Sequence, residues 1–132
     1  MSEYLIGQAA GRVGLSPDTL RYYEKIGLLP TVSRNSAGRR MYVDKDISRL
    51  NFVKRAQRMN FTLAEIAQLL EMRENPQGAR DEVRALSQQK LAQIEEQLKE
   101  LTVLKNEMRL LINLCNSAEH GCPIIEELEN NG

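Results

Sequence analysis

The stretch Ser16-Pro17-Asp18-Thr19-Leu20-Arg21-Tyr22-Tyr23-Glu24 carries every signal that starts a helix. Ser16 can serve as the N-cap, and Pro17 fits the first helical position. Asp18 suits the positive end of the helix dipole. The sequence therefore predicts a helix that begins after Ser16, continues through Ile26 and ends at Gly27.

A shorter helix is predicted just upstream, over residues 6–13. Its small apolar residues Ala9, Ala10 and Val13 share one face, and Gly14 can end it in the left-handed conformation. Two short helices joined by a glycine-containing turn form a helix-turn-helix, whose second helix lies in the major groove of DNA. This pattern indicates a nucleic-acid-binding module.

Residues 31–43 predict a β-hairpin, or wing. Residues 31–33 and 40–43 are β-prone, and the polar stretch between them, 34–39, contains Gly38. A third helix is expected over residues 45–59, with Asp44 as its cap and Asn60 in the left-handed turn that ends it.

Thr62 and Glu65 form a capping-box pattern that opens a fourth helix, expected to run through about Met72. Asn75-Pro76-Gln77-Gly78 interrupts it. From Asp81 the chain is helix-prone to Leu114, a length of about 50 Å at ~1.5 Å per residue.

The long helix carries apolar residues at intervals of three or four, the spacing of a coiled-coil seam. They are Leu91, Ile94, Leu98, Leu101, Leu104, Met108, Leu111 and Cys115. A helix striped in this way cannot bury its own apolar face, so a parallel or antiparallel pair with a second copy is expected.

Charge is divided unevenly along the 132 residues, although the formal net charge is +0. Residues 1–60 hold eleven Lys or Arg against five Asp or Glu, a balance of +6, and residues 61–132 hold seven against thirteen, a balance of −6. A basic front half joined to an acidic back half indicates a phosphate-binding module and a separate sensing or assembly module.

Three motifs together resemble the MerR family of bacterial transcription regulators: residues 16–24, Gly27-Leu28-Leu29, and Gly38-Arg39-Arg40-Met41-Tyr42. The terminal Cys115 and Cys122-Pro123-Ile124 resemble its metal-sensing branch. The resemblance implies a mainly α fold, with a winged helix-turn-helix domain over residues 1–75, a long antiparallel coiled-coil dimerisation helix over 76–114, and a metal-binding loop with a short terminal helix over 115–132.

The resemblance also implies the partners and the mode of action. A homodimer would bind a palindromic operator in promoter DNA, and effector binding would make it distort the DNA so that RNA polymerase can engage both promoter elements. Candidate DNA contacts lie on the second helix, in the wing and near the end of the third helix. They are Ser16, Thr19, Arg21, Tyr22, Arg34, Arg39, Arg40, Tyr42, Lys54 and Arg58.

Cys115 and Cys122 are the two cysteines of the chain, and the loop between them contains Gly121, which lets the chain turn back. Two thiolates that converge on one ion select Cu(I), Ag(I), Zn, Cd, Pb or Hg over hard cations. A reversible disulfide that senses oxidants or electrophiles is the competing interpretation.

The identity of the metal depends on further ligands. The resemblance implies a third cysteine near the start of the long helix in divalent sensors and a serine there in copper sensors, whereas this chain has Arg80 beside Asp81. Two thiolates with Cu(I) leave a charge of −1 that Arg80 of a second copy could offset. Tetrahedral zinc needs more ligands, for which His120 and Asp81 are candidates. The missing third cysteine favours Cu(I), with Zn, Cd, Pb and Hg left open.

Catalytic patterns are absent from the sequence: there is no Ser/His/Asp set and no phosphate-cradling glycine loop, and the chain has one histidine. The protein is therefore not expected to be an enzyme. No apolar run approaches the ~18 residues of a membrane span, and the N-terminus lacks a signal-peptide pattern, so a cytoplasmic protein is expected.

Overall fold

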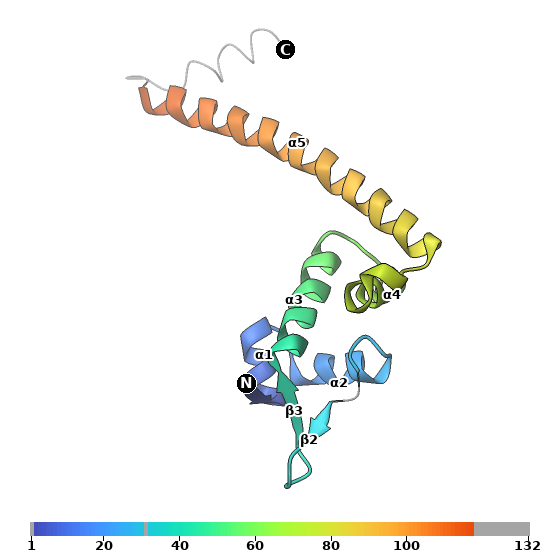
Figure 1. Ribbon diagram of the computed structural model, residues 1–132. Helices are drawn as coiled ribbons and strands as arrows, with labels where there is room; N and C mark the ends of the chain where they lie inside the picture. The colour runs from blue at the N-terminus through green and yellow to red at the C-terminus, as the bar shows by residue number, and fades with distance from the viewer. Residues whose placement is uncertain (1, 31, 118–132) are drawn as a thin grey trace. The chain divides into compact units, whose positions relative to one another are not determined.

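The computed structural model describes residues 2–30 and 32–117. Its elements follow one another along the chain (Figure 1) as β1 Glu3–Leu5, α1 Ile6–Val13, α2 Pro17–Lys25, β2 Ser33–Arg34, β3 Arg40–Val43, α3 Asp44–Arg58, α4 Leu63–Glu74, the short 3-10 helix η1 Pro76–Gly78 and α5 Asp81–Ser117. The expectation of a mainly helical fold with a helix-turn-helix is confirmed.

The two helices of the helix-turn-helix begin and end for the predicted reasons. Gly14 has φ 71°, and the Ser16 side chain accepts the Thr19 amide proton at 3.1 Å. α2 ends one residue earlier than expected, at Lys25. The Tyr23 carbonyl there accepts from the amides of Leu28 and Leu29 instead of continuing the helical pattern, and Gly27 has φ 85°.

The sheet has three antiparallel strands in the order β1-β3-β2. β2 and β3 form the predicted hairpin, with Ser33 opposite Met41 and Arg34 opposite Arg40. β1, which pairs along β3 from Glu3 opposite Val43 to Leu5 opposite Met41, was not predicted. A strand of three residues is too short to show an alternating pattern, and only its pairing with β3 defines it.

The third and fourth helices differ from prediction at their ends. α3 begins at Asp44, which is therefore inside the helix, and Val43 is the N-cap residue; the side chain of Asp46 accepts the Val43 amide proton at 3.0 Å. The Thr62–Glu65 capping box is present, with bonds of 2.9 and 3.1 Å. α4 runs two residues beyond Met72, because Glu74 is held by side chains of α3.

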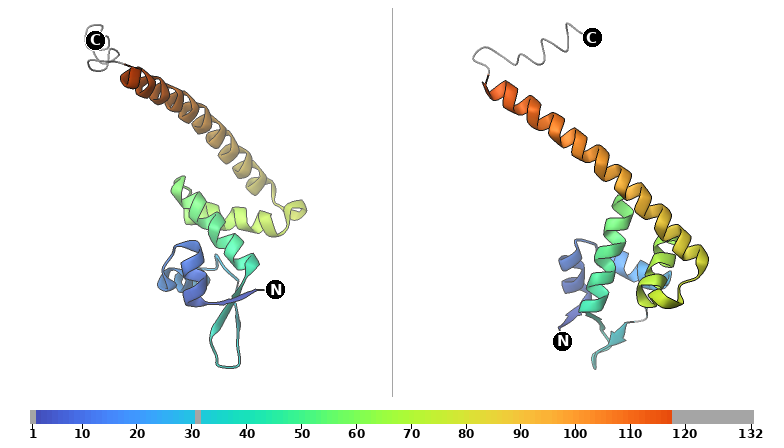
Figure 2. Two further views of the ribbon diagram at one scale, coloured as in Figure 1. Left: turned by 90° about the vertical axis from the view of Figure 1, so that its left-hand side faces the viewer. Right: turned by 45° about the horizontal axis from the view of Figure 1, so that its top comes forward.

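Residues 1–86 form a compact unit with its own core. α1, α2 and α3 pack together beside the sheet, and the hairpin projects from one end of the helices (Figure 2). The core side chains come from α1 to α5, from the segment after α2 and from the wing strand β3: Val13, Leu20, Leu29, Leu50, Val53, Ile66, Val83 and Tyr42 are all at most 2% exposed.

α5 continues from this unit into a second one, which starts at Ser87. α5 is one uninterrupted helix of 37 residues, three residues longer than predicted. Its apolar side chains from Leu91 onward are largely exposed in the single chain; Leu98 and Leu101 are 57% and 60% exposed. Among the described residues, no helix combines the length and apolar character needed to cross a membrane.

Candidate nucleic-acid interface and effector site

A groove of about 600 Å³ lies between the wing, α2 and the start of α1. Its lining combines four arginines with the last residue of β1 and the first residues of α1: Arg21, Arg34, Arg39, Arg40, Leu5, Ile6, Gly7 and Gln8. Four of the residues that the sequence singled out are thus brought together from two separate segments, α2 and the wing. The groove presents a concentrated positive charge at one end of the unit.

Two of the arginines are held by carboxylates of α2. Arg40 Nε donates to Glu24 Oε2 at 2.7 Å, and the two side chains are only 27% and 16% exposed. Arg21 Nη1 donates to Asp18 Oδ1 at 2.7 Å, in a pair that is far more exposed. The ion pair with Glu24 therefore fixes the position of the Arg40 guanidinium. Arg21, in its exposed pair, can readily exchange Asp18 for another anion such as a phosphate.

The wing tip is held by hydrogen bonds between side chains and the backbone. Asn35 Oδ1 accepts the amide protons of Ala37 and Arg39, both at 3.0 Å, and Arg34 Nη1 donates to the Gly38 carbonyl at 2.7 Å. Gly38 has φ 80°, in the left-handed region that favours glycine. This frame keeps Arg34 and Arg39 on an exposed hairpin that cannot easily fold back.

The first turn of α1 also lines the groove, and sequence reasoning missed it. The amide protons of a first helical turn have no partner within the helix, so this end attracts phosphate. Here Gln8 accepts the Leu5 amide proton at 2.8 Å, and Ile6, Gly7 and Gln8 of this turn line the groove. The signal in the sequence was the small residue Gly7 at the start of the predicted helix.

Ser16, Thr19 and Tyr22 lie at the start and middle of α2. The Ser16 and Thr19 hydroxyls are 2.8 Å apart and share a hydrogen bond. Ser16 is therefore first of all a helix cap. Tyr22 is 50% exposed beside the buried Tyr23, whose hydroxyl donates to Gln57 at 2.8 Å. Tyr23 is 4% exposed and belongs to the core.

Tyr42 corrects one prediction. Its side chain is 0% exposed, so it belongs to the core and does not reach DNA beside the wing arginines. The alternation of β3 explains this: Tyr42 lies between Met41 and Val43, and its side chain points from the sheet into the core. Burial, and next the nearby carboxylate of Glu24, raise the pKa of Tyr42.

The two cations predicted on α3 have different surroundings. Lys54 Nζ donates to the Val13 carbonyl at 2.7 Å, so it caps the negative end of α1. Arg58, the last residue of α3, is exposed. The bond to Val13 gives Lys54 a structural role, whereas Arg58 forms no ion pair with any of the described residues.

The predicted effector residues fall at the two ends of α5. Asp81 is its first residue, and Cys115, in its last turn, is disulfide-bonded in the structure. Arg80 donates to Glu71 at 3.4 Å in an exposed pair. Cys122 and His120 lie outside the described residues. Within the part of the chain described, no three His, Cys, Asp or Glu side chains gather in a way that could hold a metal ion.

Two family models match this chain. The model described as MerR HTH family regulatory protein matches residues 4–73, and the one described as MerR, DNA binding matches residues 47–111. This chain belongs to the MerR family. Together the matched ranges of the two MerR models cover the basic groove, the α3–α4 region and most of α5.

Individual MerR-family relatives agree over nearly the full length. The HTH-type transcriptional regulator HmrR of Rhizobium leguminosarum bv. viciae is 37% identical, over 95% of this chain and 97% of its own length. The crystal structure of PbrR691 from Ralstonia metallidurans CH34, in complex with lead(II), is 35% identical, with a TM-score of 0.56 over 93% and 97% of the two chains. These MerR relatives are transcription regulators, not enzymes.

A further MerR-family structure holds DNA. HiNmlR, described as lacking the sensor domain and bound to promoter DNA, is 26% identical, with a TM-score of 0.69 over 89% of each chain. The MerR family thus includes relatives of similar length that bind promoter DNA or a heavy metal.

Proposed function

We propose that this protein is a metal-responsive transcription regulator that binds a palindromic operator as a homodimer. The observation that carries the proposal is the groove in which Arg21, Arg34, Arg39 and Arg40 converge with the start of α1. Cations and helix N-termini are the groups that contact DNA phosphates, and such contacts set the register of a protein on the duplex.

Within this interface α2 and the wing contact different parts of the DNA. α2 enters the major groove, where Thr19, Arg21 and Tyr22 meet base edges or the backbone. The wing lies along the sugar-phosphate track through Arg34, Arg39 and Arg40. Affinity then comes mainly from the wing and the start of α1, and sequence preference comes mainly from α2.

The dimer is formed by α5. The predicted seam residues recur on one side of the helix and most of them are exposed in the single chain, whereas Ile94 and Leu111 are half-buried. An apolar stripe of this length needs cover in water. A second copy, arranged antiparallel as in the family resemblance, supplies a matching stripe. Each copy would then bring one basic groove to one half of the operator.

The effector is a thiophilic metal ion held by Cys115 and Cys122, with Cu(I) favoured. Two thiolates and Cu(I) leave a net negative charge, and an arginine near the start of the second copy's α5 would offset it. Arg80 is suited to this task because its present pair with Glu71 is exposed, long and therefore weak. Divalent Zn, Cd, Pb or Hg would need more donors, such as His120 or Asp81.

Activation would follow because metal binding at the end of α5 changes the orientation of the two DNA-binding units of the dimer. The operator is then distorted, and RNA polymerase engages both promoter elements of an efflux or detoxification gene. The second candidate is a redox or electrophile sensor, and the disulfide at Cys115 favours it specifically.

A single titration separates the candidates. Fully reduced protein is added to a transcription assay from the operator-containing promoter, with Cu(I), Ag(I), Zn²⁺, Cd²⁺, Pb²⁺ or Hg²⁺, and in parallel with diamide. We expect Cu(I) and Ag(I) to activate the wild type and not Cys115→Ser. Activation by the divalent ions alone identifies a divalent sensor, activation by diamide alone identifies the redox sensor, and no activation by any addition refutes the proposal.

A further inference from the structure

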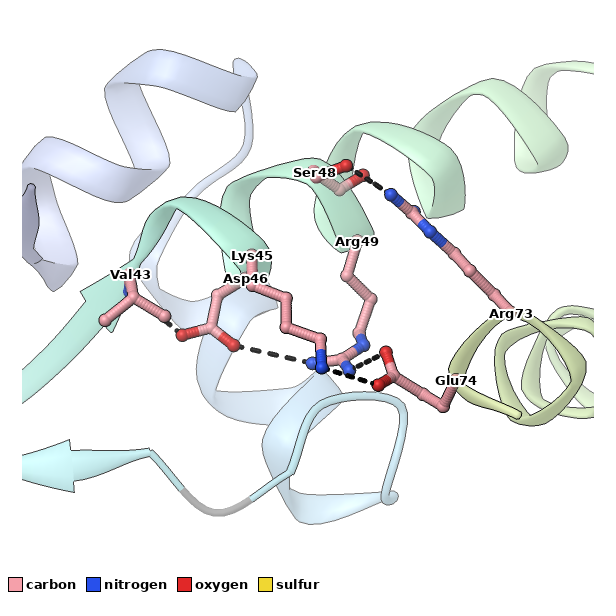
Figure 3. A network of polar contacts seen from close by, with 7 residues as sticks. All are labelled: Val43, Lys45, Asp46, Ser48, Arg49, Arg73 and Glu74. Atoms are coloured by element: carbon pink, nitrogen blue, oxygen red, sulfur yellow. Dashed lines mark hydrogen bonds and ion pairs between the residues drawn. The ribbon is translucent and has the colours of Figure 1, made fainter. Parts of the chain in front are cut away.

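Four charged side chains of α3 and α4, Lys45, Asp46, Arg49 and Glu74, form a connected group that we term the α3–α4 ion cluster (Figure 3). The Arg49 guanidinium lies between Asp46, at 3.5 Å, and Glu74, with which it forms an ion pair and hydrogen bond. Lys45 Nζ also reaches Glu74, at 2.8 Å. Two cations and two carboxylates make the cluster neutral.

Burial makes the arginine the critical member. Arg49 and Asp46 are each only 6% exposed. Removing a partner from a buried ion costs much more than breaking a surface pair, because the remaining charge loses its compensation. If the angle between α3 and α4 changes, Arg49 either moves together with Glu74 or loses its ion pair with Glu74. Because a buried charge without its partner is costly, movement of Arg49 with Glu74 is favoured.

The cluster is connected to the wing through the backbone. The second oxygen of Asp46 accepts the amide proton of Val43 at 3.0 Å, and Val43 is the last residue of β3. β3 is the central strand of the sheet and carries Arg40 of the basic groove. A continuous series of bonds thus runs from Glu74 through Arg49 and Asp46 to the strand that carries a DNA-facing cation.

The other end of the series lies at the entrance to α5. Glu74 is the last residue of α4, and Asn75, whose side chain accepts the Gly78 amide proton at 3.2 Å, starts the turn that leads to α5. Hydrogen bonds from Lys45 and then Arg49 lower the pKa of Glu74, so its carboxylate stays ionised at neutral pH. Glu74 therefore carries the negative charge that its ion pairs with Lys45 and Arg49 require.

We infer that Arg49 and Glu74 are positioning residues that pass the orientation of the α4 end to the wing, so that effector binding on α5 changes DNA binding through this series of bonds. The inference rests on the proposed function for its effector, and on the described contacts for its path. We therefore expect that breaking one bond in the series between Glu74 and Val43 uncouples the effector response of α5 from the wing. Both the DNA-binding groove and the metal ligands stay in place.

The chain offers a matched control in the neighbouring contact between the same two helices. Arg73 donates to the Ser48 hydroxyl and, at 3.2 Å, to the Ser48 carbonyl, and its guanidinium lies 5.8 Å from the Phe52 ring centre. Arg73 precedes Glu74 on α4, yet among the described residues these contacts lead to α3 and not to β3 (Figure 3). Arg73→Gln therefore weakens α3–α4 packing and leaves the series intact.

The test compares full-length Glu74→Gln, Asp46→Asn, their double variant and Arg73→Gln. Operator affinity without effector should stay within about threefold of wild type in all four, because the groove is untouched. Induction of transcription by Cu(I), or by whichever ion activates the wild type, should fall roughly tenfold in Glu74→Gln, a size typical of allosteric coupling. Arg73→Gln should retain induction.

The double variant distinguishes transmission from mere stability. Because Glu74→Gln and Asp46→Asn cut one series at two points, the double variant should lose no more induction than either single variant. Losses in induction that multiply, or an equal loss in Arg73→Gln, would show that the cluster only stabilises the fold and would overturn the inference.

A readout without effector keeps this test independent of the proposed function. In amide hydrogen exchange on the metal-free protein, Glu74→Gln should raise exchange at Val43 and at the neighbouring wing amides, and Arg73→Gln should not. If no metal or oxidant activates the wild type, the proposed function fails while this measurement still decides the path. Unchanged exchange at Val43 in Glu74→Gln would refute the path whatever the effector.

Discussion

The apolar side chains are mostly buried in residues 1–86 and largely exposed in the part of α5 that follows Leu86. In the first region Leu20 and Leu50 are completely buried within one chain, whereas in the second Leu98 and Leu101 are more than half exposed. The first region closes its own core around α3, and the second shows a stripe that has no cover in the single chain. The first region thus folds around its own core, whereas in the proposed function the apolar stripe of the second region is covered by a second copy.

The largest expected effect tests the self-contained unit. Leu50→Ala should lower the free energy of unfolding by about 3 kcal/mol, because it removes a fully buried side chain and leaves a cavity in a packed core. Urea denaturation followed by circular dichroism measures this. Leu98→Ala is the matched control: it should leave the unfolding of the 1–86 unit unchanged, and an equal loss would erase the distinction between the two regions.

The next effect tests the stripe on α5. Leu101→Glu should weaken the dimer at least about thirtyfold, since a carboxylate in a coiled-coil seam loses its water without gaining a partner. Val103→Glu serves as control, because Val103 is nearly as exposed, at 57% against 60%, and lies on the opposite side of the helix. Sedimentation equilibrium measures both. Equal weakening by the two variants would exclude the predicted seam.

A smaller effect is expected for Arg40→Ala in the basic groove. The variant should weaken operator binding about tenfold at any DNA sequence and make the salt dependence shallower by about one phosphate contact. The Glu24 carboxylate, left without its cation, would add repulsion toward phosphate. Fluorescence anisotropy between 50 and 200 mM salt, roughly the range in which such slopes are resolved, measures both. Arg55→Ala, which removes an exposed cation outside the groove lining, is the control, and an unchanged slope in Arg40→Ala would remove Arg40 from the interface.

The smallest effect concerns Tyr42, whose buried hydroxyl has no hydrogen-bond partner among the described residues. Tyr42→Phe should stabilise the protein by about 1 kcal/mol, because it removes an unsatisfied polar group without changing shape. The raised pKa of Tyr42 adds a pH dependence. Above the ordinary pKa of 10.0 the unfolded protein releases the Tyr42 proton while the folded protein retains it, so the free energy of unfolding falls as the pH rises above that value.

Unfolding at pH 8 and pH 10.5 would test this point. The wild type should lose more stability than Tyr42→Phe between these values, and a parallel loss in both proteins would place the alkaline sensitivity elsewhere.

Local signals in the sequence were sufficient for most helix boundaries. Ser16, Pro17, Thr62 and Glu65 act within one turn of their own positions, so the beginnings of α2 and α4 follow from their neighbours alone. Gly14 and Asn60 likewise adopt the left-handed conformation that ends a helix. The glycine-bearing polar tip similarly indicated the wing, and periodicity indicated the long α5.

Tertiary structure alone decided which charged and aromatic residues reach the surface. A run such as Arg39-Arg40-Met41-Tyr42 reads as one basic, aromatic patch, yet pairing of β3 with β1 and β2 sends Tyr42 into the core and brings Arg40 to Glu24 of α2. Packing also decides the role of Lys54, which donates to the carbonyl at the end of α1. Arg49 has the sequence character of a surface cation, yet it lies buried between Asp46 and Glu74. The sequence determines caps, turns and periodicity because these depend on residues a few positions apart. Partners separated by 16 to 41 positions depend on how the elements pack.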